Sequence, residues 1–250
     1  MTPDFRLDDL EPADQDTAAL HYGTWEEEFE QISQHDVGER SFIIAFDTTA
    51  TWNFVPHMPN IAAFDIVRDT QQGTFSMRRS THAGLAFAQN WLVNRGCPPD
   101  ALAPSSEFAF KPADELTVRV EDRIRRSGER FQVVEEQAID GADTEGWSIA
   151  VDRQDKDLPV RLLFEQVQPD RATYSVREGA FVDLVAADRW LEERSVPLPE
   201  PPEYGLDAGA LRTRAALART PAAAVPRPGG SAPSPAAKPV IPQRSPGRSL

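Results

Sequence analysis

The chain has 250 residues, enough for one or two domains with hydrophobic cores, and a net charge of −14 at pH 7. Residues 1–207 hold 40 acidic and 19 basic residues, a net charge of −21, whereas residues 208–250 hold seven basic residues and no acidic one. An acidic body repels phosphate, so the composition argues against nucleic-acid binding except through the C-terminal tail.

Composition also predicts a location and a source. The sequence contains no apolar run of about 20 residues that would cross a membrane, and its first residues lack the basic start and apolar core of a signal peptide. We therefore expect a cytoplasmic protein without a membrane partner. A single cysteine, Cys97, excludes an internal disulfide. The 23 arginines against three lysines are typical of a GC-rich bacterial genome.

Both ends of the chain differ in composition from its middle. Residues 1–23 are acidic and contain few apolar groups, so burial cannot offset the entropy of ordering them, and we expect a flexible arm. Proline and alanine dominate the basic tail at 201–250, which predicts disorder with a possible short helix at 208–219.

The middle of the chain begins with a helical pattern. A capping box that starts at Thr24 and an apolar stripe at Trp25, Phe29 and Ile32 predict an amphipathic helix over 24–38. Runs of β-branched and aromatic residues then predict strands, and a final apolar stripe predicts a helix. The expected strands are 42–46, 52–55, 61–67 and 74–78, and the expected helix is 81–94.

An internal repeat organises the sequence. Residues 74–98 recur as 173–197, at an offset of 99, with nine of 25 positions identical, where composition alone gives roughly one or two. Gly38-Glu39-Arg40 recurs as Gly128-Glu129-Arg130 at an offset of 90. The difference between the offsets places insertions at 140–145 and 153–157, and it makes Trp52 the counterpart of Trp147.

The second copy shows the same order of elements as the first. It predicts a helix at 112–126, strands at 131–139, 147–151, 160–167 and 173–177, and a helix at 181–194. The domains are then a first repeat at 24–98, a linker at 99–112 and a second repeat at 113–200.

The predicted fold class is α+β, with two tandem diverged α-β-β-β-β-α units. We expect antiparallel sheets with helices packed on one face and a pseudo-two-fold arrangement of the units. The order of elements over 24–197 resembles that of type III secretion chaperones and related regulators. That resemblance implies a protein that binds other proteins and is not an enzyme.

Two pairs on the repeated helices are candidate interface residues. Trp91 and Trp190 each precede an arginine by four residues, Arg95 and Arg194, so that ring and guanidinium can stack on one helix surface. The functional interpretation is an interface between the repeats or with a partner. The alternative is that these side chains only border the core.

Basic residues elsewhere provide two further candidates. Arg78 and Arg79 lie together at a strand end, where they could hold a small anion or form a surface ion pair. In the tail, Pro239, Pro242 and Arg244 match the proline-rich motif that aromatic grooves read in polyproline form.

Catalytic signals are missing from the sequence. The four histidines have no metal-ligand spacing, and neither a G-x-G-x-x-G motif nor a P-loop occurs. His82 and Cys97 fit packing roles better than catalytic ones. We predict no catalytic, cofactor-binding or metal-binding residue, and whether the protein is an enzyme stays uncertain, with the sequence favouring the negative answer.

Three functional hypotheses follow. The leading one is a non-catalytic protein-binding module, such as a chaperone, an adaptor or a regulator, whose partner is another protein. The alternative is a nucleic-acid-associated regulator that acts through its basic C-terminal tail, for which binding should fall steeply with salt. The second alternative is an enzyme with a site between the two repeats.

Overall fold

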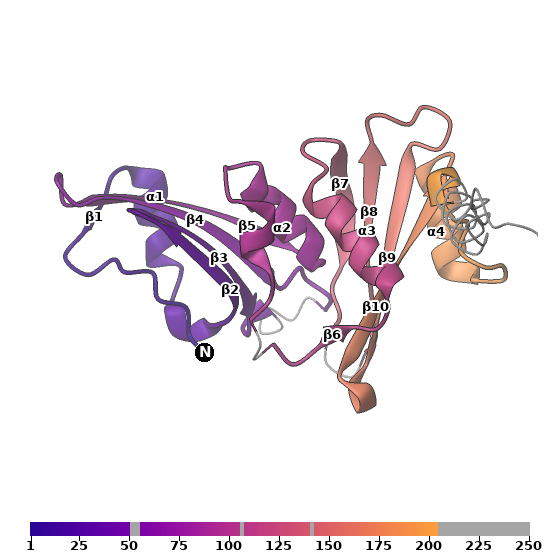
Figure 1. The fold of residues 1–250 in the computed structure, drawn as a ribbon, viewed down its shortest axis with the longest axis horizontal. Helices are drawn as coiled ribbons and strands as arrows, with labels where there is room; N and C mark the ends of the chain where they lie inside the picture. Colours follow the sequence, from indigo (N-terminus) through magenta and orange to yellow (C-terminus); the bar gives the residue numbers. More distant parts are fainter. Residues whose placement is uncertain (51–55, 106–107, 141–142, 205–250) are drawn as a thin grey trace, which may run out of the picture. The chain divides into compact units, whose positions relative to one another are not determined.

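The computed structural model describes residues 1–50, 56–105, 108–140 and 143–204, which belong to one compact unit of the chain, Met1–Leu206. Over these residues the chain has an α+β fold, with two five-stranded mixed sheets and four α-helices (Figure 1). The predicted strand at 52–55 and the predicted tail helix at 208–219 lie outside the described residues.

The first sheet has the strand order β1-β5-β4-β3-β2. The long strands pair antiparallel, whereas the short β1 pairs parallel with β5. The elements are β1 (Glu11–Pro12), α1 (Gln15–Tyr22), β2 (Phe29–Val37), β3 (Arg40–Asp47), β4 (Ile61–Asp69), β5 (Thr74–His82) and α2 (Leu85–Val93), with 3₁₀ turns at Glu26–Glu28 and Pro99–Leu102.

The second sheet has the equivalent strand order β6-β10-β9-β8-β7, and β6 again pairs parallel with β10. Both sheets are therefore mixed. The prediction of antiparallel sheets missed the short parallel strand of each. The elements are β6 (Lys111–Pro112), α3 (Glu115–Arg125), β7 (Phe131–Gln137), β8 (Glu145–Asp152), β9 (Val160–Gln168), β10 (Thr173–Phe181) and α4 (Leu184–Glu193), with a 3₁₀ turn at Pro169–Arg171.

Each sheet carries helices on both of its faces, so the expectation of helices on one face is wrong. On β3 of the first sheet, Ile43 belongs to the cluster on the α1 face, and Ile44 belongs to the cluster on the α2 face. The second sheet is covered in the same way by α3 and α4 (Figure 1). Successive apolar residues on a central strand point to opposite faces, and each face needs its own cover.

The two sheets meet through α2 and α3, which pack against each other. A two-fold arrangement would bring the same helix of each half together. Here α2 ends the first half of the chain and α3 begins the second, so unlike faces of the two sheets meet. The expected pseudo-two-fold arrangement is therefore not found.

The predicted helix over 24–38 is wrong, because most of this segment is strand β2. Alternation along the strand puts Phe29 on the α1 face of the sheet and Ile32, three residues later, on the α2 face, and a β-bulge lies between Gln31 and Ser33. The apparent helical stripe therefore comes from a strand with apolar residues on both faces. The Thr24 hydroxyl, which suggested a capping box, donates instead to the Leu20 carbonyl at the end of α1.

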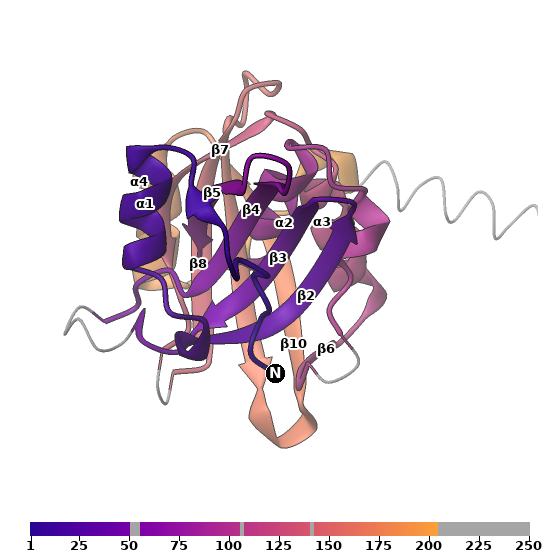
Figure 2. The ribbon, with the colours of Figure 1, turned by 90° about the vertical axis from the view of Figure 1, so that its left-hand side faces the viewer.

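The structure also differs from the flexible arm expected at 1–23. The segment lies across one face of the first sheet (Figure 2), where Phe5 is 1% exposed and its ring centroid lies 5.0 Å from that of Phe64. Arg68 fixes the backbone there, because its guanidinium donates to the carbonyls of Phe5 and Arg6. A few apolar residues are enough, because they pack against a sheet face that is itself apolar.

The proposed alignment of the two Gly-Glu-Arg motifs is also wrong. Residues 38–40 form the turn from β2 to β3, whereas 128–130 precede β7, which occupies the same place in its sheet as β2. The two motifs share their glycine because both positions adopt a positive φ, 59° at Gly38 and 62° at Gly128. The pairing of Trp52 with Trp147 depended on this alignment, and Trp52 lies outside the described residues.

Among the described residues, no helix is long and apolar enough to cross a membrane.

The burial of Phe5 predicts a stability effect. Replacing Phe5 with Ala should lower the free energy of unfolding by about 3 kcal/mol, because it leaves a cavity against Phe64. The matched control is Tyr22→Ala, since Tyr22 is 85% exposed and its loss should change the free energy by less than about 0.5 kcal/mol. Urea unfolding measures both, and equal effects would show that the N-terminal segment does not pack as described.

Candidate binding cleft

The centre of the junction between the sheets is packed with apolar side chains. Ala86 and Phe87 of α2 lie in one core cluster with Val120 and Ile124 of α3. Both α3 residues are fully buried. Here the two helices act as one layer shared by two sheets.

Amide side chains on α2 extend this contact to the end of α3. The Asn90 Nδ2 donates to the Arg125 carbonyl at 3.3 Å and to the Ser127 hydroxyl at 3.2 Å. One helical turn later, Asn94 donates to the Gly128 carbonyl at 3.0 Å. These bonds satisfy carbonyls at the C-terminal end of α3, which have no partner within the helix.

Connecting segments join the two sheets a second time. The Ala138 N–H donates to the His57 carbonyl at 2.9 Å, and the Asn60 Nδ2 donates to the Ile139 carbonyl at 3.1 Å. The β3–β4 connection is thereby bonded to the β7–β8 connection. A further contact is made by Glu136, which accepts from the Ala83 N–H at 3.1 Å just before α2 begins.

A cleft of about 500 Å³ opens beside this junction. Its lining comes from both sheets and from the connection between them, and most of the residues are apolar. The lining residues are Met1, Glu30, Gln31, Ile32, Phe46, Asn60, Ile61, Ala83, Phe108, Ala109, Phe110, Ile139, Asp143, Glu165, Val167 and Pro169.

The charged side chains of the cleft are all carboxylates. Glu30 lies on β2, Asp143 on the β7–β8 connection and Glu165 on β9. Lysine, arginine and histidine do not occur in the described lining. The cleft is therefore apolar with an acidic character.

Glu165 is the carboxylate with the most unusual environment. Burial is the main cause that raises its pKa to about 8, and the nearby charge of Glu121 raises it further. The part of the chain that the structure describes offers Glu165 no hydrogen bond and no ion pair. At neutral pH its carboxyl group is therefore mostly protonated.

Glu121 and Tyr174 form the immediate surroundings of Glu165. The Tyr174 hydroxyl donates to the Glu121 carboxylate at 2.8 Å. Burial raises the pKa of Glu121 to about 7, although this hydrogen bond and the charge of Arg125 act in the opposite direction. A small cavity of about 30 Å³, room for roughly one water, touches both Glu121 and Glu165.

The sequence analysis selected neither glutamate, although one signal was present. Along β9, Leu163, Glu165 and Val167 alternate onto one face of the strand, and Leu163 and Val167 are apolar. An acidic residue in such a series occupies a core-facing position, where charged residues are rare. The cleft itself has no sequence signal, because its lining comes from segments far apart in the chain.

The raised pKa of Glu165 predicts a pH-dependent stability. Between its ordinary value of 4.5 and about 8, the folded protein binds more protons than the unfolded chain, so this group makes stability fall as pH rises. Glu165→Gln should therefore raise the free energy of unfolding by roughly 1–3 kcal/mol at pH 8.5 and by little at pH 4.5. Denaturant unfolding at both pH values measures this. The control Glu30→Gln should show no such pH dependence, and a flat difference for Glu165→Gln would contradict the assignment.

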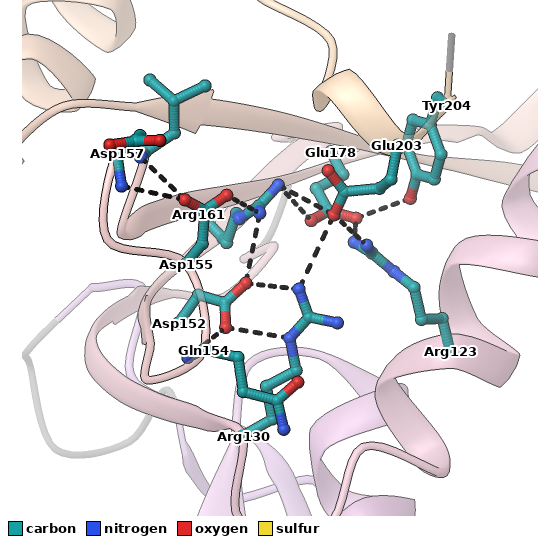
Figure 3. A network of polar contacts seen from close by, with 11 residues as sticks. Arg123, Arg130, Asp152, Gln154, Asp155, Asp157, Arg161, Glu178, Glu203 and Tyr204 are labelled. Atoms are coloured by element: carbon teal, nitrogen blue, oxygen red, sulfur yellow. Dashed lines mark hydrogen bonds and ion pairs between the residues drawn. The ribbon is translucent and has the colours of Figure 1, made fainter. Parts of the chain in front are cut away.

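A second group of charged residues lies in the second sheet around Arg161 (Figure 3). Arg161 is on β9 and is fully buried. Its Nη2 lies 3.1 Å from the Asp152 carboxylate and 2.8 Å from that of Asp155. The Asp152 side chain is itself fully buried.

Arg130 completes the surroundings of Asp152. It makes a two-point contact, with Nε–Oδ1 at 2.8 Å and Nη2–Oδ2 at 2.5 Å. Burial alone would raise the pKa of Asp152, but the hydrogen bonds from Arg130 and the Gln154 N–H outweigh it and hold the pKa below its usual value. Asp152 is therefore ionised at neutral pH.

The same network holds the segment that follows α4. Glu203 accepts from Arg123 at 2.8 Å and lies 3.2 Å from Arg161 (Figure 3). The Tyr204 hydroxyl donates to Glu178 at 2.5 Å, and Glu178 also pairs with Arg123. Three arginines thus face four carboxylates. Because these charges compensate one another, we assign the network a structural role.

The network predicts a large loss of stability when it is broken. Asp152→Ala leaves Arg161 and Arg130 without their shared carboxylate, and the free energy of unfolding should fall by about 3–5 kcal/mol. The control Asp157→Ala removes an exposed side chain nearby and should have an effect below about 0.5 kcal/mol. Chemical denaturation at pH 7 distinguishes the two, and a small effect of Asp152→Ala would mean that solvent reaches the network.

The first predicted tryptophan–arginine pair stacks, and the second does not. The Arg95 guanidinium lies 3.5 Å from the centre of the Trp91 ring. Arg194 instead lies over Phe164 at 4.7 Å, and Trp190 meets the same ring edge-on at 5.7 Å. Both tryptophans pack beside the cores of their own sheets, outside the α2–α3 cluster. A role in partner binding stays a prediction.

The remaining candidates lie apart from the cleft. Arg79 forms an ion pair with Asp47 at 2.7 Å and lies over the rings of Phe29 and Phe64, whereas Arg78 is exposed. The tail motif of Pro239, Pro242 and Arg244 lies outside the described residues.

His82 and Cys97 are enclosed by the first sheet and α2. Burial lowers the pKa of His82 to about 4, so the ring is neutral at physiological pH. Cys97 is buried in the α2-side cluster, and burial raises its pKa to about 12. Both results agree with packing roles. Within the described ranges, no three His, Cys, Asp or Glu residues are placed to hold a metal ion.

Comparison with protein-family models, with curated proteins and with solved structures gives no match for this chain.

Proposed function

We propose that this protein is a non-catalytic binding module, of the chaperone, adaptor or regulator type, that takes an apolar segment of a partner protein into the cleft. The observation that carries the proposal is the cleft of about 500 Å³ with its mainly apolar lining. When a ligand removes an apolar surface of this kind from water, the free energy of the system falls, and this favours binding.

The size of the cleft limits what it can accept. Pockets that bind small ligands typically have volumes of about 300–1,000 Å³, so a cleft of about 500 Å³ holds a few side chains and not a whole helix. The expected ligand is therefore a short peptide segment with two or three apolar side chains. Ring edges from Phe46, Phe108 and Phe110 provide the contact area.

An enzyme with its site in this cleft is the second candidate. It is favoured by the pair Glu165 and Glu121, whose pKa values of about 8 and about 7 suit proton transfer near neutral pH. Binding is favoured over catalysis because the remaining lining offers few polar groups to orient a reacting substrate. The nucleic-acid alternative depends on residues 208–250, which lie outside the described residues.

We further propose that the two halves of the chain arose by duplication of one sheet-and-helix unit. The offset of 99 from the sequence repeat also relates β4 to β9, β5 to β10 and the start of α2 to that of α4. The β4–β5 pairing, which includes Ile61 opposite His82, has the same register as β9–β10, where Val160 lies opposite Phe181. A β-bulge also occurs in both β2 and β7.

A motif at the start of each half also supports the duplication. Pro-Ala-Asp-x-x-Thr occurs at 12–17 and again at 112–117. In both copies the aspartate caps a helix by accepting from the threonine N–H, at 2.7 Å for Asp14 and 2.9 Å for Asp114. The first copy of this motif, at 12–17, lies in the segment that the sequence analysis assigned to a flexible arm.

A cleft-blocking variant tests the proposed function. Ala109 is exposed and lines the cleft, so Ala109→Trp should fill its mouth without disturbing the core. Ala103→Trp is the control, because Ala103 is exposed on the same connection but does not line the cleft. Peptides selected from a random display library on the wild-type protein should bind Ala103→Trp unchanged and Ala109→Trp at least tenfold more weakly.

Two outcomes would count against the proposal. If the library gave no enrichment on the wild-type protein, the cleft would not be a peptide site. If the selected peptides bound Ala109→Trp as tightly as the wild-type protein, their site would lie elsewhere.

A further inference from the structure

Glu165 occupies a position where the described residues provide no partner for a carboxylate. Its neighbours across the sheet are Gly146 on β8 and Val176 on β10, and neither has a polar side chain. Gly146 is restricted as well, because a Cβ there would lie 3.0 Å from the Gln137 carbonyl oxygen. The side chain of Glu165 therefore faces the cleft and the small cavity behind it.

The ionisable groups around Glu165 add to the negative charge. Glu121 approaches it from α3. The hydroxyl of Tyr174, on β10, donates a hydrogen bond to the Glu121 carboxylate. The charge of Arg125 lowers the pKa of Glu121, but it has no such effect on Glu165. A carboxylate kept in apolar surroundings without a cation is costly, and Glu165 avoids this cost by holding its proton.

The rim of the cleft has the same sign of charge. Glu30 on β2 and Asp143 on the β7–β8 connection line it, and among the described lining residues the amino terminus of Met1 is the only other charged group. The protein outside its tail carries a net charge of −21. An incoming cation is therefore attracted both at long range and at the contact itself.

We propose that the cleft recognises a lysine or arginine side chain flanked by apolar residues, and that this cation pairs with the Glu165 carboxylate. The inference rests on the proposed function, because it names the charged group of the peptide that the cleft binds. The aliphatic part of a lysine or arginine lies along an apolar lining while its head reaches a polar group. The apolar neighbours of that residue fill the remainder of the cleft.

Binding is coupled to a proton. The neutral carboxyl group of Glu165 loses its proton to the solvent as the carboxylate forms its ion pair, and the ligand keeps its own charge. Affinity for a cationic ligand therefore rises with pH until Glu165 is ionised in the free protein, and affinity for a neutral ligand of the same shape does not change. This difference separates recognition of the charge from apolar contact.

The test uses two small probes, hexylammonium and the uncharged 1-hexanol, with the full-length protein and NMR chemical-shift titration at pH 6.5 and 8.5. An alkyl amine stays protonated at both pH values. The wild-type protein should bind hexylammonium roughly tenfold more tightly at pH 8.5 than at pH 6.5, and 1-hexanol equally at both. Glu165→Gln should lose the preference for the cation and keep its affinity for 1-hexanol.

A matched variant and the remaining outcomes make the test decisive. Glu193→Gln removes an exposed carboxylate at the end of α4, outside the cleft lining, and should leave both affinities unchanged. The inference is overturned if Glu165→Gln binds hexylammonium as the wild-type protein does, if the binding of hexylammonium to Glu165→Gln keeps the wild-type pH dependence, or if Glu193→Gln shows the loss instead. Equal binding of both probes to the wild-type protein overturns the role of charge alone. Failure of both probes to bind removes the apolar cleft as a site as well.

Discussion

The fold depends on one constraint, which is that both faces of each sheet are apolar and must be covered. Ile43 and Ile44 on adjacent positions of β3 face opposite clusters, so a helix on one side alone would leave a face in water. The outer faces are covered by α1 and α4, and the inner faces share the layer of α2 and α3. The cleft lies beside that layer, and its lining again comes from both sheets.

Buried charge is treated in two different ways within the second sheet. Arg161 and Asp152 are fully enclosed, and Arg130 and Asp155 complete a network in which the charges compensate one another. Glu165, four residues further along the same strand as Arg161, has no such partner within the described part of the chain. The paired group stabilises the attachment of the C-terminal segment, whereas the unpaired group faces a cleft that a ligand can enter. The contrast locates the candidate site better than any motif.

The errors of the sequence analysis have identifiable physical causes. Phe29 and Ile32 lie three residues apart on opposite faces of β2, as strand alternation requires, and this spacing imitates the period of a helix. The N-terminal segment appeared too polar to fold alone, which is correct for an isolated segment. It is ordered because an apolar sheet face, formed by residues far along the chain, receives Phe5. Both cases depend on pairing between distant residues.

By itself the sequence determined the α+β class, the strands and both helices of the second half, and the sequence repeat at an offset of 99, because these depend on local periodicity and on similarity along the chain. The helices on opposite faces, the head-to-tail meeting of α2 with α3 and the cleft were decided only by the tertiary structure. A strand with two apolar faces does not specify which helix covers which face. Glu165 illustrates the limit, because the chain shows an acid on a core-facing strand position, and only the fold shows that none of the described cations pairs with it.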